Sequence, residues 1–353
     1  MYFAGLCTFL AASAFRQMKI TLVYENPEQW VVEREFMEGY AVPDHKPIME
    51  WQERVTNSFF EKDVRRIHID GVCLGFFRKN IFSDEVKMVR CDFPYLQMHF
   101  ELYGGGAFYT PKLGTDICLP TPAGMHTLFY VPELNGQLVY PAGTDIFSLE
   151  IEISLDWLKH QLGEEMELLG GFSISVAHER PVMLGGREFP ITPAMYRVIF
   201  DLYHCAFSGY LKKLYVESKI VELLTLQIDQ MVPADCCRRQ EKIPGNEVGR
   251  LVQVRDAIGE NLSYPYTIEE LAGIALMNRT KLQSLFKQLF GQTIHEFVLS
   301  RRMEAARRLL EKYPGEISIA EISERVGYKN YNHFSAAFRK QYGYPPSHVQ
   351  PRQ

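Results

Sequence analysis

The chain lacks the short motifs that mark the common enzyme classes. It has no Walker loop, no dinucleotide-binding glycine fingerprint and no Ser-His-Asp arrangement. It also lacks the His-x-His pair of β-barrel metal enzymes, since His68, His99 and His126 are scattered. His99 and Glu101 would share one strand face, which indicates either a solvated polar face or two ligands of a metal site. We therefore predict no catalytic residue, no cofactor and no bound metal.

Cysteines are few and form no recognisable pattern. There are seven, an odd number, without any C-x-x-C spacing. This excludes a disulfide framework or a zinc site as the basis of the fold. Cys236 and Cys237 precede a basic pair in a predicted linker. We interpret them as exposed linker residues, with a redox or metal switch as the alternative.

One apolar stretch stands at the start of the chain, from Met1 to Ala14. It is too short to span a bilayer. It also has no cation before Arg16, whereas a secretory signal begins with positive charge. We expect residues 1–17 to be a non-native or disordered extension, with translation starting at Met18 and the protein in the cytoplasm, associated with the nucleoid. Export is the alternative.

Charge is distributed unevenly along the 353 residues, which exceed one ordinary domain in length. From Asn246 onward there are 15 Lys and Arg against 11 Asp and Glu, and the preceding part has 23 against 32. A mildly basic C-terminal part on an acidic body is typical of a nucleic-acid-binding module joined to a domain with another role.

The basic part contains the same unit twice, at 267–291 and 318–343. Each copy begins with a helix-capping residue and a capping-box glutamate, continues with two apolar helical stripes around a turn, and ends on a glycine. The plan is that of a helix-turn-helix, whose second helix enters the major groove. The matched positions, 51 or 52 residues apart, are Thr267 and Ser318, Glu270 and Glu321, Leu282 and Phe334, Phe286 and Phe338, and Gly291 and Gly343.

A single amphipathic helix is predicted over 293–311, between the two copies. Nineteen residues at ~1.5 Å each span ~28 Å. This is close to the ~34 Å that separates successive major grooves on one face of DNA. The spacing favours tandem DNA-binding units over the alternative, a helical bundle with an accidental repeat.

The stretch from Gly249 to Pro346 resembles the AraC/XylS family of transcriptional regulators. There are two departures. Leu276 stands where the first turn of the family usually has Gly, and must avoid a positive φ or accept strain. After the last proline the chain has His348-Val349-Gln350 instead of an aromatic-Arg pair. The residues that carry the resemblance are Leu271-Ala272, Leu282, Phe286-Lys287, Gly291, Arg302-Met303, Ala306, Ile319, Ile322, Gly327-Tyr328, Phe334, Phe338, Gly343 and Pro346.

Periodicity changes to two between residues 60 and 153, which predicts many short antiparallel strands in a barrel or jelly roll. A helical region follows over 154–231, then a linker over 232–246 and a DNA-binding domain over 247–350. The fold class is therefore α+β: an N-terminal β-barrel with a helical appendage over 18–231 and an all-α C-terminal domain with two helix-turn-helix motifs. The family resemblance implies that the barrel is cupin-like and binds an effector.

The segments from Leu96 to Leu102 and from Phe129 to Glu133 are loosely similar to the subgroup of siderophore regulators such as the pyochelin regulator. The effector would then be a siderophore or another metabolite, with unknown binding residues. Leu214, Val221 and Ile228 lie seven apart on a long predicted helix. They indicate either a homodimer seam or a helix packed on the β-domain.

Recognition residues are expected on the outward faces of the two second helices. Gln283 could pair with adenine, and Arg279 and Lys281 with guanine or phosphate. The resemblance assigns base contacts to the positions of Thr280, Gln283, Ser284, Tyr331, Asn332 and Ala336, and Ala336 has no hydrogen-bonding side chain. The predicted DNA-binding residues are Arg279, Thr280, Lys281, Gln283, Ser284, Arg302, Asn330, Tyr331, Asn332, His333, Ser335 and Arg339.

The sequence thus predicts a sequence-specific transcriptional regulator, an activator by family type. A small-molecule effector would control it, and promoter DNA and RNA polymerase would be its partners. One alternative is a regulator without an effector, controlled by abundance or a protein partner. The other is a metal-dependent barrel enzyme fused to a DNA-binding module.

Overall fold

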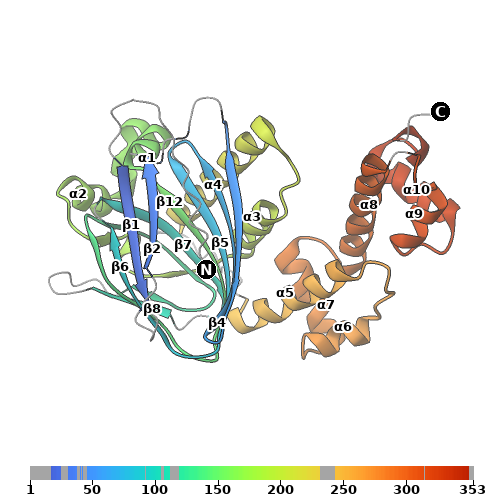
Figure 1. Ribbon diagram of the computed structural model, residues 1–353, viewed down its shortest axis with the longest axis horizontal. Helices are drawn as coiled ribbons and strands as arrows, with labels where there is room; N and C mark the ends of the chain where they lie inside the picture. Colours follow the sequence, from blue (N-terminus) through green and yellow to red (C-terminus); the bar gives the residue numbers. More distant parts are fainter. Residues whose placement is uncertain are drawn as a thin grey trace.

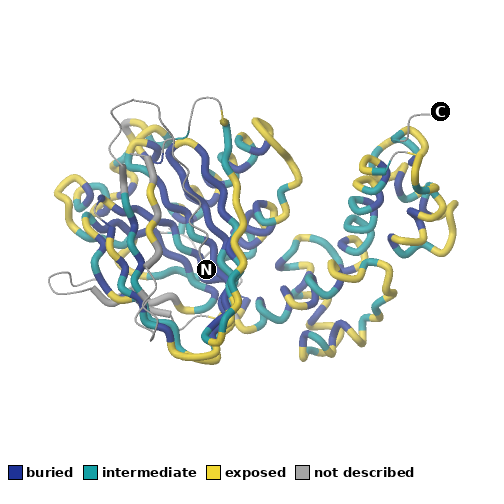
Figure 2. The backbone as a smooth tube through the Cα atoms, in the orientation of Figure 1, coloured by how far each residue is buried: buried dark blue, intermediate teal, exposed yellow. Residues whose placement is uncertain are grey.

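The chain forms a sheet domain (residues 17–230) and a helical domain (residues 243–349) that extends away from it (Figure 1). In Figure 2 the buried residues follow the central strands and the inner faces of the helices, while exposed residues follow the loops. The computed structural model describes residues 17–24, 31–37, 40, 42, 46–91, 93–104, 107–111, 119–230, 243–313 and 315–349.

Two antiparallel sheets make up the sheet domain. The first has the order β2-β1-β6-β11-β8-β9, and the second β13-β10-β7-β12-β5-β4-β3, with β14 also pairing with β10. The strands of the first sheet are β1 (Gln17–Tyr24), β2 (Val31–Met37), β6 (Glu85–Cys91), β8 (Ala107–Pro111), β9 (Leu119–Thr121) and β11 (Leu134–Tyr140). Those of the second are β3 (Met49–Thr56), β4 (Phe60–Ile69), β5 (Val72–Ile81), β7 (Tyr95–Tyr103), β10 (Met125–Val131), β12 (Asp145–Ile153), β13 (Val182–Met183) and β14 (Phe189–Pro190).

Over the described residues the sheets do not close into a barrel, one of the two arrangements that we predicted. Over the described ranges they are two open sheets, and β3 is an edge strand. Most of β3 is exposed, and its charged side chains suit an unpaired edge. Residues of both sheets, among them Ile20, Val89 and Phe129, form one core between them. Strands also begin well before residue 60, with β1, β2 and β3, which we did not predict from the sequence.

Both faces of the second sheet are covered. Leu96, Met98 and Phe100 of β7 point to one side, where they join the core beneath the helices. Gln97 and Glu101 point to the other side, toward the first sheet, and are also buried. The polar face that the sequence favoured as solvated is therefore an interior face.

Helices cover the outer face of this sheet (Figure 1). Ser154 caps the first of them and Thr192 caps α3, each by accepting a hydrogen bond from a backbone N–H three residues on. The elements are α1 (Leu155–Leu162), η2 (Gly163–Leu169), α2 (Gly171–Ala177), η3 (Leu184–Gly186), α3 (Pro193–Tyr203) and α4 (Gly209–Asp229).

The long helix α4 packs mainly on its own domain. Of its predicted seam residues, Leu214 is 63% exposed, but Val221 and Ile228 lie partly buried against the core. Leu224 is fully buried, and Met231 lies outside the described residues. The heptad pattern therefore reflects packing on the sheet domain over most of its length, and homodimerisation stays a prediction.

His126 of β10 ties the sheet to the end of α4. Its Nδ1 accepts from Gln227 Nε2 at 3.0 Å, and its Nε2 lies 2.7 Å from Gln230 Oε1. Both bonds require the neutral ring with the proton on Nε2. Burial lowers the pKa of His126 to about 4, against an opposing effect of the Gln230 bond.

The helical domain contains two helix pairs on either side of a long helix. The first pair is α6–α7 and the second pair is α9–α10, and α8 leads from one to the other (Figure 1). The bounds are α5 (Gly245–Glu260), α6 (Ile268–Ile274), α7 (Arg279–Phe290), α8 (Ile294–Lys312), α9 (Ile319–Arg325), α10 (Tyr331–Tyr342) and η4 (Pro346–His348).

The cores of the two helix pairs differ in what they join. The core of the sheet domain continues through α3 into α5, α6 and α7 and ends at Phe297 of α8. A second core, with Met303, Leu310, Phe334 and Phe338, belongs to the second pair and the far half of α8. The first pair is thus packed against the sheet domain, whereas the second pair has a core of its own.

One buried and two partly buried charged side chains lie where the domains meet. Arg255 of α5 lies 4.4 Å from the ring centre of Phe200 on α3, and its guanidinium donates to Asp256 Oδ1 at 2.8 Å. Arg78 of β5 donates to Asp256 Oδ2 at 2.5 Å. Burial would raise the pKa of Asp256, but the charges of Arg255 and Arg78 outweigh it and hold the pKa below its usual value. We call Arg78, Phe200, Arg255 and Asp256 the junction cluster.

Two predicted segments fall largely outside the described residues. Of the extension over 1–17 only Gln17 is described, as the first residue of β1, and of the linker over 232–246 only residues 243–246 are described. Among the helices that the structure describes, none is both long and apolar enough to cross a bilayer.

The His126 contacts predict a loss of stability in mild acid. The unfolded chain takes up a proton near pH 6.5 and the folded chain only near pH 4, so stability falls as the pH drops between these values. We expect His126→Gln to remove about 2 kcal/mol of the stability difference between pH 7 and pH 5, measured by urea unfolding. His348→Gln, at an exposed position, should leave that difference unchanged.

Candidate functional site

The first helix pair is built by side-chain caps. Thr267 and Glu270 form a reciprocal capping box at the start of α6, as the sequence predicts. Asn278 accepts from Lys281 N–H at the start of α7. At the end of α7, Gly291 has a φ of 74°, the left-handed conformation that glycine adopts without strain. The caps therefore define where α7 begins and ends.

The second helix pair repeats this construction with one difference. Ser318 caps α9 by accepting from Glu321 N–H, but the Glu321 carboxylate pairs with Arg325. Asn330 Oδ1 accepts from the backbone N–H groups of Asn332 and His333 and so caps α10. Asn330, which we predicted to contact DNA, therefore has a structural role through its side-chain oxygen.

The turn of the second pair is one residue longer than that of the first, and the two turns also differ at one matched position. Leu276 has a φ of 50° and Gly327, its counterpart, a φ of 90°. A branched side chain in the left-handed region costs roughly 1–2 kcal/mol. Leu276 is also 73% exposed, so packing compensates little of this cost. The departure seen in the sequence is thus accommodated by strain and not by another turn.

The predicted recognition residues of α7 share one open face. Leu282 and Phe286 are buried on the opposite side. A shallow surface hollow on the open face includes Arg279, Thr280 and Lys281 together with Ser284 and Leu285. The exposed predicted residues are Arg279, Thr280, Lys281, Gln283 and Ser284.

Helix α10 presents a similar face. Phe334 and Phe338 point into the second core, and a shallow hollow on the other side includes Tyr331, Asn332 and Ser335. Tyr331, Asn332, His333 and Arg339 are exposed, while Ser335 is half-buried. Each helix pair therefore exposes a polar helix face.

The cations at the start of α7 already have acidic neighbours. Arg279 lies 2.5 Å from Glu269 and Lys281 lies 2.5 Å from Glu247. Exposed ion pairs of this kind contribute at most about 1 kcal/mol. Both cations can therefore exchange these carboxylates for DNA phosphates at little cost.

Arg302, predicted as a phosphate contact, has backbone partners within the chain. Its Nε donates to the carbonyl of Leu262 at 2.8 Å and its Nη1 to the carbonyl of Gly327 at 3.1 Å. A backbone carbonyl from each side of α8 thus occupies the guanidinium. Arg302 ties the chain before the first pair to the turn of the second pair, and its assignment to DNA stays a prediction.

A second candidate site lies between the two sheets. This strand cavity has a volume of 160 Å³. The first sheet contributes mainly apolar walls, such as Val89 and Leu138, and the second sheet contributes most of the polar groups. The polar residues around it are Lys62, Lys79, Lys87, Tyr95, Gln97, His99, Glu101, Tyr109, Thr127, Tyr140, Ser148, Glu150 and Glu152.

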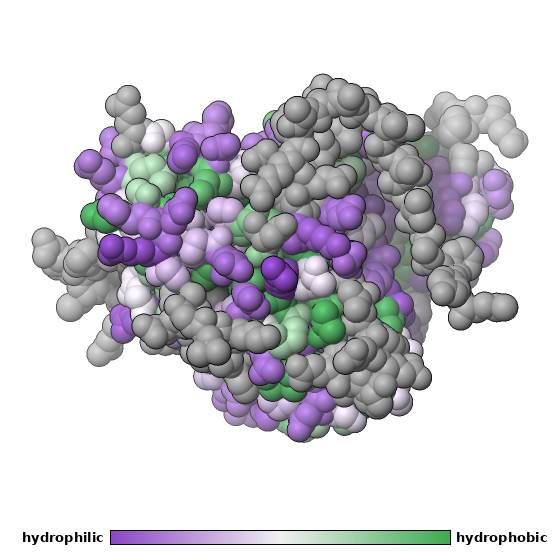
Figure 3. All heavy atoms as spheres, turned by 60° about the vertical axis from the view of Figure 1, so that its left-hand side comes forward, coloured by the Kyte–Doolittle hydropathy of each residue, from purple (hydrophilic) through white to green (hydrophobic). Residues whose placement is uncertain are grey.

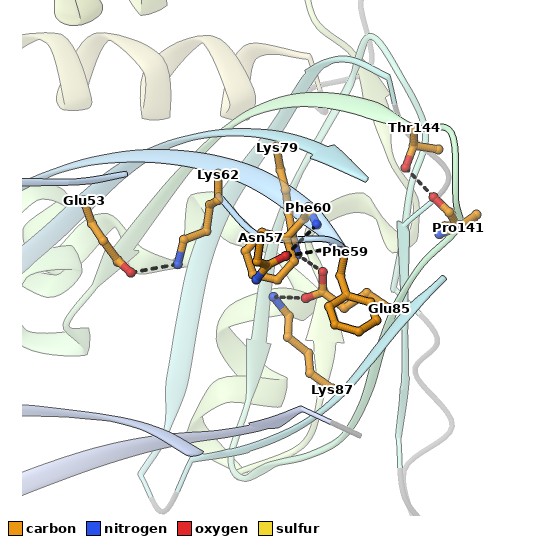
Figure 4. A network of polar contacts seen from close by, with 10 residues as sticks. All are labelled: Glu53, Asn57, Phe59, Phe60, Lys62, Lys79, Glu85, Lys87, Pro141 and Thr144. Atoms are coloured by element: carbon orange, nitrogen blue, oxygen red, sulfur yellow. Dashed lines mark hydrogen bonds and ion pairs between the residues drawn. The ribbon is translucent and has the colours of Figure 1, made fainter. Parts of the chain in front are cut away.

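The lysines at one end of the strand cavity are engaged with carboxylates (Figure 4). Lys79 donates to Glu85, and Lys87 lies 3.9 Å from the same carboxylate. Lys62 turns to Glu53, at 3.1 Å. Burial lowers the pKa of Lys79 to about 8, against the opposing effect of Glu85. Glu85 thus neutralises part of the positive charge at this end.

Sequence reasoning did not find the strand cavity, and the effector residues were left unknown. The signal was present in the polar positions of β7 and β12, Gln97, Glu101, Ser148 and Glu152, which alternate with the apolar ones. Such alternation is the same for a sheet facing water and for one facing a polar cavity. Among the described residues, no group of three or more His, Cys, Asp or Glu is placed to hold a metal ion.

Two family profiles match successive parts of the chain. A Helix-turn-helix domain profile matches residues 271–352, and a profile of the Regulatory protein PchR N-terminal domain matches residues 87–243. The chain belongs to the AraC/XylS family of transcriptional regulators. The first match covers both helix pairs, and the second covers most strands around the cavity.

Known transcriptional regulators match this chain in part. The probable transcriptional regulator LumQ of Photobacterium leiognathi is 28% identical over 100 residues, which are 28% of this chain and 40% of LumQ. The HTH-type transcriptional regulator AlkR of Acinetobacter baylyi is 32% identical over 84 residues, 24% of this chain and 27% of AlkR. This chain therefore spans less than half the length of either relative. A crystal structure of the DNA-binding domain of AdpA with a target DNA is 28% identical and covers 28% of this chain and 87% of that chain, with a TM-score of 0.27.

The strained turn predicts that Leu276→Gly stabilises the first helix pair. Relief of the left-handed strain exceeds the entropy that glycine adds to the unfolded chain, so we expect a gain of about 0.5–1 kcal/mol. Thermal and urea unfolding measure it. The converse change, Gly327→Ala, should destabilise, because a Cβ there would lie 2.8 Å from the Leu262 carbonyl oxygen and from Arg302. A destabilising Leu276→Gly would contradict the assignment of strain.

Proposed function

We propose that this AraC/XylS-family protein is a sequence-specific transcriptional regulator with α7 and α10 as its recognition helices. The observation that carries the proposal is the pair of exposed polar helix faces at opposite ends of α8. Helix α8 has 19 residues, which span ~28 Å. That length supports the binding of both faces to successive major grooves, ~34 Å apart.

Direct base contacts are proposed for Thr280, Gln283 and Ser284 on α7 and for Tyr331 and Asn332 on α10. Arg279, Lys281 and Arg339 would contact phosphates or guanine. The α7 face has more hydrogen-bonding side chains, since Ala336 of α10 has none. We therefore propose that the half-site bound by the first helix pair contributes more to specificity.

The strand cavity supports a second element of the proposal, control by a small-molecule effector. Ligand sites are typically concave, with apolar walls and a few converging polar groups. The cavity has both, and the PchR N-terminal profile covers most of the strands that form it.

Coupling between the cavity and DNA would run through the shared core. β5 contributes Phe77 and Lys79 to the cavity and Arg78, between them in sequence, to the junction cluster. A ligand that shifts β5 would thus also shift the surface on which α5 and α7 pack. Such control requires that the ligand bind two arrangements of the domains with different affinity. Homodimerisation and contact with RNA polymerase are further proposals of the same regulatory type.

Base reading by Gln283 is tested by substitution. Gln283→Ala should relax specificity at one base pair and cost about 1–3 kcal/mol on the preferred site, measured by selection and binding of operator variants. Arg279→Ala, on the same face, is the comparison. A uniform loss over all sequences, with the salt dependence reduced by about one phosphate contact, would assign Arg279 to a phosphate, and a loss at one base pair would assign it to guanine. A uniform loss for Gln283→Ala would remove it from base readout.

The junction cluster is tested by Asp256→Asn. The variant leaves the buried guanidinium of Arg255 and the partly buried one of Arg78 without their carboxylate, and breaking a buried pair costs about 3–5 kcal/mol. We expect faster hydrogen exchange in α3, α5 and α7, with the second core unchanged as an internal reference. Glu269→Gln breaks an exposed ion pair and should cost at most about 1 kcal/mol. Exchange that is unchanged in Asp256→Asn would refute coupling through this contact.

The alternative function, a regulator without an effector, leads to a different expected result. If abundance or a protein partner controls activity, DNA affinity in vitro will not respond to any cavity ligand. A DNA-binding assay on the full chain, with and without compounds that raise its melting temperature, separates the two.

A further inference from the structure

Four polar side chains on the cavity wall have no polar partner among the residues that the structure describes. Gln97, Thr127 and Ser148 are 5%, 5% and 3% exposed, and Glu150 is half-buried. Among the described residues, none of the four makes a hydrogen bond or an ion pair, and the Thr127 hydroxyl is completely buried. Because buried polar groups are nearly always hydrogen-bonded, this group of side chains is suited to hold a ligand.

The strand register brings these groups together. Thr127 of β10 and Glu150 of β12 are the two cross-strand neighbours of His99 on β7. Ser148 pairs with Glu101, the next inward position on β7, and Gln97 is the inward position on the other side of His99. The unpartnered groups therefore surround one point of the wall and do not scatter over it.

The charge at this point is negative. Glu101 lies 3.5 Å from His99, and Glu152 accepts a hydrogen bond from Tyr95 at 3.3 Å. Glu150 makes no such bond, although its charge helps to raise the pKa of His99, against the effect of burial. Among the described residues, this part of the wall thus carries three carboxylates and one group that can become a cation, His99.

The lysines at the opposite end are less suited to bind an anion. Lys79 and Lys87 share the fully buried Glu85, and their ammonium groups lie 4.2 Å and 4.5 Å from the ring centre of Tyr140. Lys62 has its own carboxylate. The group that most lacks a counter-charge is therefore Glu150.

Size and wall chemistry narrow the ligand further. The volume of 160 Å³ is comparable to that of an engineered protein cavity of ~150 Å³ that binds benzene. Phe77, Tyr109 and Phe129 line the cavity with aromatic surface. Aromatic rings also attract cations across their faces.

We propose that the strand cavity binds a small amine, a cationic nitrogen on an apolar body of about one ring. Glu150 is the counter-ion, and Thr127, Ser148 and Gln97 hydrogen-bond the nitrogen and its neighbours. The inference rests on the proposed effector function and names the chemical class of the effector.

The test uses three probes with the same ring and different charge. Phenethylamine, 2-phenylethanol and 3-phenylpropionate are titrated into the full-length protein by calorimetry, with melting temperature as a second readout. We expect phenethylamine to bind at least tenfold more tightly than either other probe. Glu150→Gln should remove at least tenfold of its affinity, and Thr127→Val should weaken it to a smaller extent.

Controls separate binding from folding and from DNA binding. Glu61→Gln, an exposed carboxylate on β4, should leave the affinity for phenethylamine unchanged. The melting temperature and circular dichroism of Glu150→Gln without ligand should match the parent, which shows that the loss is not unfolding. DNA binding of the same samples is measured in parallel, so a failed DNA-binding proposal shows there and not in the titrations.

Three results would overturn the inference. Tighter binding of 3-phenylpropionate, lost in Lys79→Met, would assign the cavity to anions and keep the effector proposal. Equal binding of 2-phenylethanol and phenethylamine would remove any role for charge. Binding of none of the probes at millimolar concentration would exclude a one-ring amine.

Discussion

The buried contact between α5 and α3 determines how the rest of this protein is arranged. Arg255 lies against Phe200 and is held by Asp256, which also binds Arg78 on β5. A buried guanidinium is tolerated only when its charge is paired, so the positions of these side chains can change little. It keeps α5, and with it the first helix pair, at one position on the sheet domain.

The two helix pairs consequently differ in how they are attached to the sheet domain. They share sequence pattern and local build, but the first pair is part of the sheet-domain core and the second is attached through α8. Arg302 stabilises that attachment by bonding backbone on both sides of α8. An effector signal would reach the first pair directly and the second only through α8. This gives a physical reason for two similar units to have different regulatory weight.

The strand cavity and the junction cluster use neighbouring residues of one strand. Along β5, Phe77 and Lys79 face the cavity while Arg78 reaches Asp256. Successive side chains of a strand point to opposite faces, so a small shift of β5 moves both sites together. Under the proposed effector control, this alternation would connect the strand cavity to the first helix pair by a short path along one strand.

Sequence alone determined the local features of the helical domain. The capping residues Thr267 and Ser318 and the glycine at Gly291 mark helix ends through interactions within a few residues, and the spacing of Leu282 and Phe286 shows which face is buried. The exposed faces of α7 and α10 follow directly, so the candidate DNA contacts could be named in advance.

Tertiary structure decided what depends on contacts between distant segments. Gln97 and Glu101 alternate with apolar residues as on a water-facing strand, and only the first sheet opposite them makes that face a cavity. Arginine is a residue type that often contacts phosphate, so the sequence suggested that role for Arg302. Only the tertiary structure brings the carbonyls of Leu262 and Gly327 close enough to accept hydrogen bonds from it. Periodicity reports that a side chain lies on one face of an element, but what covers that face is set by residues far away in sequence.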